Sequence, residues 1–66
     1  MMRVSLRAAR VNRGLKQSEA AKLLGKNKKT VYMWENGKAK PSLDMVEPIC
    51  KLYGVSYDEI DWNRTG

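Results

Sequence analysis

Glycines divide the sequence into pieces that are long enough for short helices and for little else. They occur at Gly14, Gly25, Gly37 and Gly54, and Pro41 follows the third of them closely. Glycine adopts the left-handed conformation that ends a helix without a steric penalty, and proline cannot continue a helix. Because no repeat, low-complexity tract or long linker interrupts this pattern, we expect residues 1–66 to form a single domain.

The size and composition of the chain limit the kind of core that it can build. A chain of 66 residues buries on folding only about 60% of the surface that the unfolded chain exposes. Apolar residues make up 42% of the sequence, and the single Cys50 cannot form an internal disulfide. No segment alternates cleanly enough between apolar and polar residues for a strand. These features predict an all-α fold, a compact bundle of four to five short helices.

Apolar spacing and capping residues place the expected helices. They cover residues 3–13, 17–24, 28–35 after the N-cap Asn27, and 41 or 42 to 53. A fifth begins at Ser56, where S-Y-D-E fits a capping box and Val55 and Ile60 are placed as a hydrophobic staple. Pro48 lies inside the fourth helix, so this segment either kinks there or begins as an irregular turn, and we favour a kink.

The third expected helix has two chemically different sides. At about 100° per residue, Val31 and Trp34 fall on one side together with Thr30. The opposite arc, roughly 140° wide, carries two lysines, a tyrosine and a methionine: Lys28, Lys29, Tyr32 and Met33. We therefore expect Val31 and Trp34 to lie in the core, with the cationic side turned toward a partner.

Positive charge is concentrated in the first two thirds of the chain. Residues 1–40 contain eleven lysines and arginines but two acids, whereas residues 41–66 contain two basic and five acidic residues. The net charge of the whole chain is +6. This distribution favours a polyanionic partner on one face; the alternative is that surplus lysine only keeps a small protein soluble.

The spacing within residues 17–36 is typical of a helix-turn-helix. Ala21 is small enough for two helices to approach closely, Gly25 permits a tight turn, and Val31 and Trp34 anchor the second helix. The wider sequence, about residues 4–60, resembles the phage repressor and Cro-type helix-turn-helix family, also called the xenobiotic-response-element family of bacterial regulators. The matching residues are Arg10, Glu19, Ala21 and Gly25 and the stretches GLKQ (14–17), TVYMWENGK (30–38), PS (41–42) and YGVSYDEI (53–60).

The resemblance implies a lambda-repressor-like DNA-binding domain whose third helix, residues 28–35, enters the major groove. The positions that it assigns to base edges are Asn27, Lys28, Lys29 and Met33, with Tyr32 beside them. The positions that it assigns to the sugar-phosphate backbone are Gln17, Asn36, Lys38 and Lys40, and Gln17 also braces the third helix. Lys16 replaces the usual Ser, Thr or Asn cap of the second helix, but a lysine there can still reach a phosphate.

Arg10 and Glu35 match an ion pair of this family that joins the first helix to the third. The residues themselves support the pairing, because Glu35 falls in the last turn of its helix, where the helix dipole disfavours an anion. A fixed cation nearby would remove that penalty. The alternative is an exposed carboxylate without a partner.

These features favour a sequence-specific transcriptional regulator that binds an operator in double-stranded DNA, with repression as the expected effect. A domain this small covers little DNA, so we expect a homodimer on a pseudo-palindromic site. The acidic C-terminal third, which bears Trp62, is the candidate contact surface between the two copies. A second hypothesis is an antitoxin-like protein-interaction module that also binds DNA.

Other classes of function have little support in the sequence. It contains no histidine, no Cys/His cluster, no glycine-rich phosphate loop and no paired carboxylates suited to catalysis. We therefore expect no enzyme activity, metal or cofactor, and no small-molecule ligand is evident. No apolar run approaches the length of a membrane span, and the N-terminus lacks the features of a signal peptide. A cytoplasmic protein of a phage or a bacterium is expected.

Overall fold

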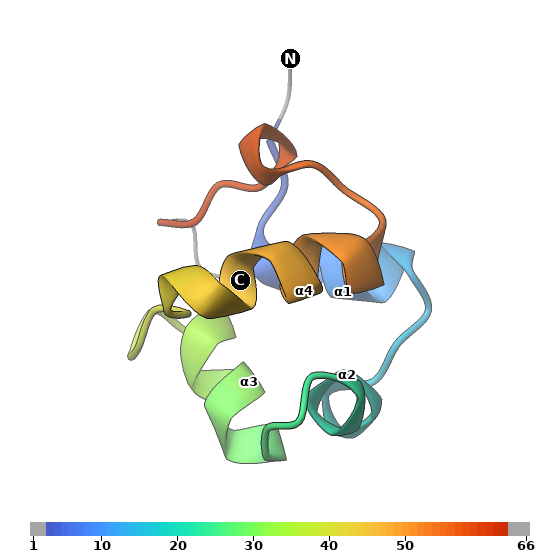
Figure 1. Ribbon diagram of the computed structural model, residues 1–66, viewed down its shortest axis with the longest axis vertical. Coiled ribbons are helices and arrows are strands. Elements are labelled where there is room, and N and C mark those ends of the chain that lie inside the picture. The colour runs from blue at the N-terminus through green and yellow to red at the C-terminus, as the bar shows by residue number, and fades with distance from the viewer. Residues whose placement is uncertain (1–2, 64–66) are drawn as a thin grey trace.

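Four α-helices and one 3₁₀ turn make up residues 3–63, which the computed structural model describes (Figure 1). They are α1 (Leu6–Asn12), α2 (Gln17–Leu23), α3 (Lys28–Glu35), α4 (Leu43–Tyr53) and the 3₁₀ turn η1 (Tyr57–Glu59). The all-α bundle expected from the sequence is confirmed. The fifth helix expected after Ser56 is a single 3₁₀ turn, because the backbone is already extended at Ile60.

The segment before α1 lies beside the segment after η1 (Figure 1). The Val4 N–H donates to the Glu59 carbonyl at 2.9 Å, and the Asp61 N–H donates to the Val4 carbonyl at 2.8 Å. Val4 and Ile60 thus form an isolated parallel bridge. A bridge of one residue on each side produces no alternation of apolar and polar residues, so the sequence does not predict it. Because Val4 is held in this bridge, residues 3–5 do not extend the first helix.

α1 and α2 begin with different caps. The Ser5 side chain accepts a hydrogen bond from the Ala8 N–H at 3.0 Å, which satisfies one of the free donors of α1. At α2 the N-cap position is Lys16, whose side chain has no acceptor. Glu19 offsets part of this loss, because its carboxylate accepts from the Lys16 backbone N–H at 2.8 Å.

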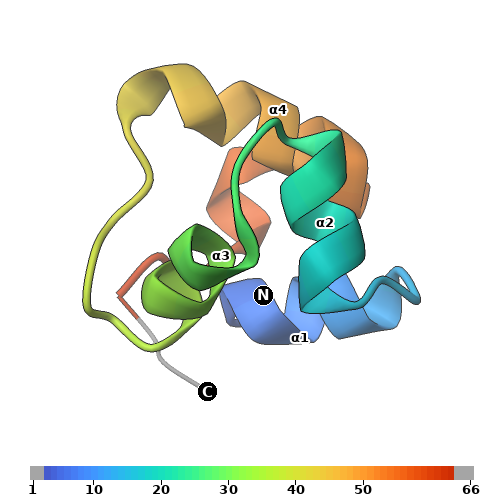
Figure 2. The same ribbon diagram turned by 90° about the horizontal axis from the view of Figure 1, so that it is seen from below.

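The turn between α2 and α3 sets how these two helices meet, side by side in Figure 2. Gly25 has φ +69°, a left-handed conformation, and the following Lys26 N–H donates back to the Ala21 carbonyl at 2.8 Å. Asn27 then caps α3 by accepting from the Thr30 N–H at 2.8 Å, as expected from the sequence. The expected helix-turn-helix geometry is therefore present.

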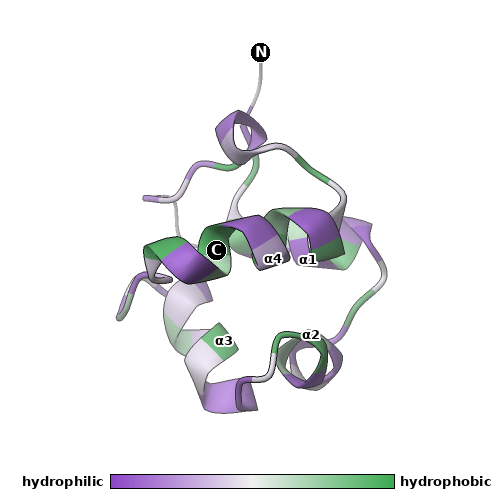
Figure 3. Cartoon of the chain, in the orientation of Figure 1, coloured by the Kyte–Doolittle hydropathy of each residue, from purple (hydrophilic) through white to green (hydrophobic). Residues whose placement is uncertain are grey.

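The core lies between the helices and takes residues from each of them. Its buried apolar members are Leu6, Ala9, Ala20, Ala21, Val31, Trp34, Met45, Ile49, Tyr53 and Ile60. Val31 is 1% exposed and Trp34 is 9% exposed, which confirms that this side of α3 is the anchored side. The start of α3, by contrast, is hydrophilic (Figure 3).

α4 continues through Pro48 as one helix of eleven residues, so the alternative of an irregular start is wrong. Pro48 is exposed, and the hydrogen bond that it removes is the one to the Asp44 carbonyl, in the first turn of the helix. The helix ends at Gly54, in a left-handed conformation with φ +69°, and the Val55 N–H then donates to the Cys50 carbonyl at 3.0 Å.

Candidate nucleic-acid interface

The outward side of α3 carries the side chains that the sequence assigned to base edges. Lys28 and Lys29 are exposed in its first turn, Tyr32 is exposed one turn later, and Met33 is half-buried. Asn27 is exposed at the N-cap, where its side-chain oxygen also accepts from the Thr30 hydroxyl. The buried side of the same helix fixes the direction in which this face points.

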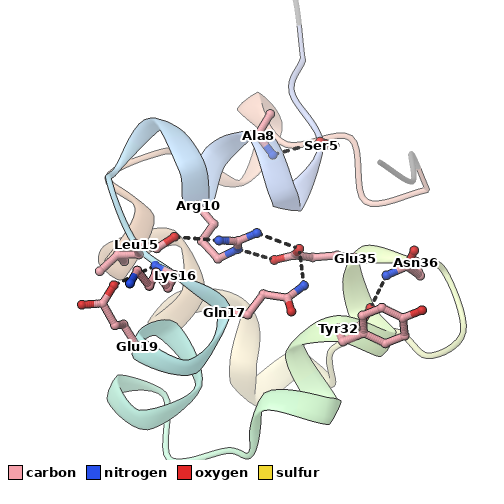
Figure 4. A network of polar contacts seen from close by, with 10 residues as sticks. All are labelled: Ser5, Ala8, Arg10, Leu15, Lys16, Gln17, Glu19, Tyr32, Glu35 and Asn36. Atoms are coloured by element: carbon pink, nitrogen blue, oxygen red, sulfur yellow. Dashed lines mark hydrogen bonds and ion pairs between the residues drawn. The ribbon is translucent and has the colours of Figure 1, made fainter.

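A buried ion pair joins α3 to α1 (Figure 4). Arg10 donates from Nε to Glu35 Oε2 at 2.7 Å and from Nη2 to Glu35 Oε1 at 3.2 Å. Its third donor, Nη1, reaches the Leu15 carbonyl at 2.6 Å. The expected pair is therefore present, and the fixed cation accounts for a carboxylate in the last turn of α3.

Gln17 extends this network to α2. Its side-chain Nε2 donates to Glu35 Oε1 at 3.0 Å (Figure 4), so the Glu35 carboxylate contacts residues from both preceding helices. Within residues 3–63, every buried side-chain nitrogen and oxygen has a hydrogen-bond partner. A polar network thus joins the three helices, and each of its buried groups has a hydrogen-bond partner. Buried charges are tolerated in a protein when they are paired in this way.

A hollow of about 530 Å³ opens between α1, α2 and α3, with this network in its wall. Its lining residues are Arg7, Arg10, Lys16, Gln17, Ser18, Lys28, Tyr32, Glu35 and Asn36. Three of them, Arg7, Lys16 and Lys28, are exposed cations, and no exposed acid lies among the rest. Cationic and hydrogen-bonding groups around an open hollow suit an anionic group such as a phosphodiester.

The loop after α3 carries the remaining residues that the resemblance assigned to the sugar-phosphate backbone of DNA. The Asn36 side-chain amide donates to the Tyr32 carbonyl at 2.8 Å, which closes the end of the helix. Lys38 is exposed, and its backbone N–H donates to the Met33 carbonyl at 2.9 Å. Lys40 is also exposed, but it does not line the hollow, and its ammonium donates to the Asn63 side chain.

Comparison with known proteins matches residues 6–60 to the helix-turn-helix family. The chain belongs to this family. The resemblance to Cro-type helix-turn-helix proteins is therefore confirmed, and with it a DNA-binding domain of the lambda-repressor-like fold. This is a family of DNA-binding regulators and not of enzymes, in agreement with the sequence.

Two curated relatives extend the match over most of the chain. The transcriptional repressor RstR of the cryptic phage CTXphi of Vibrio cholerae is 38% identical over 60 residues, covering 91% of this chain but 54% of the repressor. An uncharacterized HTH-type transcriptional regulator of Archaeoglobus fulgidus is 30% identical over 59 residues, covering 89% of this chain and 84% of that protein. The chain thus spans about half the length of the phage repressor. No solved structure gives a significant match.

The helix-turn-helix brings some of the expected site residues together and leaves others apart. The hollow collects Lys16, Gln17, Lys28, Tyr32 and Asn36 around the ion pair. Outside it lie Asn27, Lys29, Met33, Lys38 and Lys40. Arg7 was not among the predicted site residues, although it stands three residues before Arg10 and therefore on the same face of the first helix.

Tyr53 in α4 lies within the electrostatic influence of the ion pair, but burial has the larger effect on its ionisation. Burial raises the pKa of Tyr53 to about 12; the Glu35 carboxylate acts in the same direction and the Arg10 guanidinium against it. Tyr53 therefore keeps its proton to a higher pH than an ordinary tyrosine does.

Among the described residues, none of the helices is both long enough and apolar enough to cross a membrane.

Proposed function

We propose that the chain acts as a cytoplasmic transcriptional repressor that binds an operator in double-stranded DNA and inserts α3 into the major groove. The observation that carries this proposal is the fixed orientation of α3. Its inner side is held by Val31 and Trp34 and its end by the Arg10–Glu35 pair, so the cationic side points outward next to a cationic hollow. The phage relative is a transcriptional repressor, which supports repression in place of activation.

Base recognition is assigned to five residues of α3 and its cap: Asn27, Lys28, Lys29, Tyr32 and Met33. A lysine ammonium donates to guanine O6 or N7, and the Met33 thioether suits the methyl group of thymine. A preference for half-sites that contain guanine follows. Lys29 is the clearest base-reading candidate, because it is exposed and lies outside the hollow.

Contacts to the sugar-phosphate backbone are assigned to residues on either side of α3: Lys16, Gln17, Asn36, Lys38 and Lys40. We add Arg7, because it lines the same hollow as Lys16 and Gln17. The Gln17 side-chain amide donates one of its two hydrogens to Glu35, so the second is available for a phosphate oxygen. A phosphate in the hollow would contact both Arg7 and Lys16, since both side chains line it. These contacts set the register of α3 on the duplex without reading its sequence.

Two copies are proposed to bind one operator, since a single domain of this size reads too few base pairs for high specificity. The half-site centres then lie about 34 Å apart, one turn of the duplex. Repression follows from occupancy, because a bound dimer blocks access of polymerase to the same DNA.

Salt-dependent binding tests the proposal. Fluorescence anisotropy with a labelled duplex of mixed sequence should give a logarithmic affinity that falls with the logarithm of salt concentration at a slope near −5, if about six phosphates are neutralised per subunit. Arg7→Gln should reduce that slope by about one unit, whereas Arg13→Gln, an exposed arginine that does not line the hollow, serves as the matched control. Absence of binding at low salt would overturn the proposed function.

A further inference from the structure

Asn27 is the N-cap of α3 and is also one of the residues assigned to base edges. Its side-chain oxygen accepts two hydrogen bonds from Thr30, one from the backbone N–H at 2.8 Å and one from the hydroxyl at 2.8 Å. A carbonyl oxygen has two lone pairs. Both are occupied within the protein, so this oxygen has no capacity left to accept a hydrogen bond from DNA.

The side-chain nitrogen of Asn27 is in the opposite situation. Asn27 is exposed, and its amide hydrogens donate to no other group within residues 3–63. The contact with Thr30 also fixes which end of the amide is which, because a backbone N–H only donates and therefore holds the oxygen, and not the nitrogen, on its side. Asn27 thus has two free donors and no free acceptor to offer a partner.

Thr30 produces this restriction from the inner side of the helix. Its side chain is half-buried and falls on the same side of α3 as Val31 and Trp34, away from the lysines. The backbone N–H of any residue at this position would supply the first bond to Asn27. The second bond needs the hydroxyl. Thr30 is therefore a positioning residue, which acts on DNA recognition through Asn27.

The neighbours of Asn27 have the same polarity. Lys28 and Lys29 follow it directly, and an ammonium group donates hydrogen bonds but accepts none. The first turn of α3 contains no acid. The one carboxylate of the helix, that of Glu35, is buried in the pair with Arg10. The start of α3 therefore presents hydrogen-bond donors.

The major groove distinguishes donors from acceptors. Guanine N7 and O6, adenine N7 and thymine O4 accept hydrogen bonds, whereas the amino groups of adenine and cytosine donate them. Asparagine commonly reads adenine through a bidentate contact, in which it donates to N7 and accepts from the N6 amino group. That contact needs a free side-chain oxygen, and the oxygen of Asn27 is occupied.

We propose that Thr30 restricts Asn27 to donating, so that Asn27 contacts acceptor atoms of the major groove and does not form the bidentate contact with adenine. This inference rests on the proposed function and deepens it, because it concerns which base atoms the same face of α3 recognises. It gives a role in specificity to Thr30, a half-buried residue that the sequence analysis placed only on the anchored side of the helix.

Base analogues test the polarity of the contact. The probe is the duplex that the wild type enriches from a random library, with its adenines replaced by 2-aminopurine. This base pairs with thymine and keeps N7, but it has no amino group in the major groove. Wild-type affinity, measured by fluorescence anisotropy, should stay within about twofold, since Asn27 does not accept from that amino group. Replacement of guanine by 7-deazaguanine removes an acceptor instead and should weaken binding about fivefold or more.

Asn27→Ser assigns any effect to this residue, because serine keeps a capping oxygen and lacks the amide. A loss of about fivefold with 2-aminopurine that is absent from Asn27→Ser would show that Asn27 accepts from adenine, and the proposal would fail. An enriched half-site without adenine excludes the bidentate contact directly.

Two variants of Thr30 separate positioning from a purely structural role. Thr30→Ser keeps the hydroxyl, whereas Thr30→Val has nearly the same shape without it. Both keep the backbone N–H that is capped by Asn27, so circular dichroism should match the wild type. Library selection with Thr30→Ser should return the wild-type sequence. Thr30→Val should change the preferred base pair at the position that Asn27→Ser identifies. Weaker binding of Thr30→Val to an unchanged sequence overturns the role of Thr30.

The same measurements distinguish this inference from the proposed function. Thr30→Val should keep the salt dependence of the wild type, because its phosphate-contacting residues are intact. If the wild type binds no duplex at low salt, the proposed function fails. If the wild type and Thr30→Val both bind DNA and enrich one and the same sequence, only the inference about Thr30 fails.

Discussion

Glu35 is the residue through which three helices share one polar contact. Its carboxylate accepts hydrogen bonds from Arg10 and Gln17 and is buried, whereas a second ion pair of the described residues, Glu47–Lys51, is exposed to solvent. A buried pair adds little net stability, because desolvation of both charges offsets their attraction. We expect its main effect to be on specificity, because loss of either partner leaves the other charge buried and unpaired.

Replacement of Glu35 by alanine should destabilise the fold by about 3 kcal/mol, because Arg10 would remain buried without its partner. Urea denaturation at neutral pH measures the change. The control is Glu47→Ala, whose pair is exposed and whose loss should cost less than about 0.5 kcal/mol. Equal costs for the two variants would contradict the structural role of Glu35. The double variant Arg10→Met with Glu35→Leu should recover much of the stability.

Tyr53 gives a prediction for alkaline pH. Its pKa is about 12 in the folded chain against 10.0 for an ordinary tyrosine, so the folded state holds its proton where the unfolded state has lost it. Stability is therefore unaffected by Tyr53 below pH 10 and falls as the pH rises from 10 toward 12. Ultraviolet absorbance should show an ionisation step near pH 12 that belongs to Tyr53 and is absent from Tyr53→Phe. In Tyr53→Phe the stability should decline less over this range.

At the residue scale the sequence predicted what depends on periodicity. Val31 and Trp34 were placed in the core because a helix wheel separates them from the lysines. The Arg10–Glu35 pair came from the resemblance and from the helix dipole. The Gln17 bond to Glu35 was not predicted as such, because it depends on how three helices cross and no local pattern encodes that crossing.

The turn between α2 and α3 decides whether the two helices form a helix-turn-helix. Gly25 adopts φ +69°, and no other atom lies within 4 Å of the position that a Cβ would take. A substitution there tests backbone strain alone, since there is no clash. The turn then delivers Asn27 to its capping position at the start of α3.

Gly25→Ala should lower the free energy of unfolding by about 1 kcal/mol. The left-handed conformation strains an alanine in the folded state, and the lower conformational entropy of alanine in the unfolded chain offsets part of that strain. In a domain of this size the melting temperature would fall by about 5 °C. Gly25→Asn should cost less, because asparagine visits this conformation more readily. Thermal unfolding followed by circular dichroism compares the two, and an alanine variant as stable as the wild type would contradict this account of the turn.

Elements with strong end signals were predicted well. α2, α3 and α4 lie within a residue or two of their expected bounds, because glycine and asparagine mark their ends. The length of the segment after Ser56 was predicted poorly, because a capping box indicates where a helix starts but not how long it is. The bridge between Val4 and Ile60 joins opposite ends of the chain, and local sequence carries no signal for it.

For the whole molecule, two hollows differ in their chemistry. The hollow between α1, α2 and α3 is lined by cations, whereas the walls of the smaller hollow come largely from Pro41, Leu43, Val46, Tyr57 and Trp62. The cationic hollow was predictable in part, because basic residues concentrate within residues 1–40. The smaller hollow was predictable only as far as Trp62, since the exposure of Leu43 depends on where the loop and the C-terminal segment lie.

We propose that α3 reads DNA sequence with its outward side, while the residues around it contact the sugar-phosphate backbone. The most direct test is selection from a random duplex library with the wild type, Lys29→Ala and Lys38→Ala. The wild type should enrich a pseudo-palindrome with guanine in each half-site. Lys29→Ala should change the preferred base within each half-site, and Lys38→Ala should weaken binding but return the wild-type sequence. Enrichment of the same sequence by the wild type and by Lys29→Ala, or of no sequence at all by the wild type, would contradict the account.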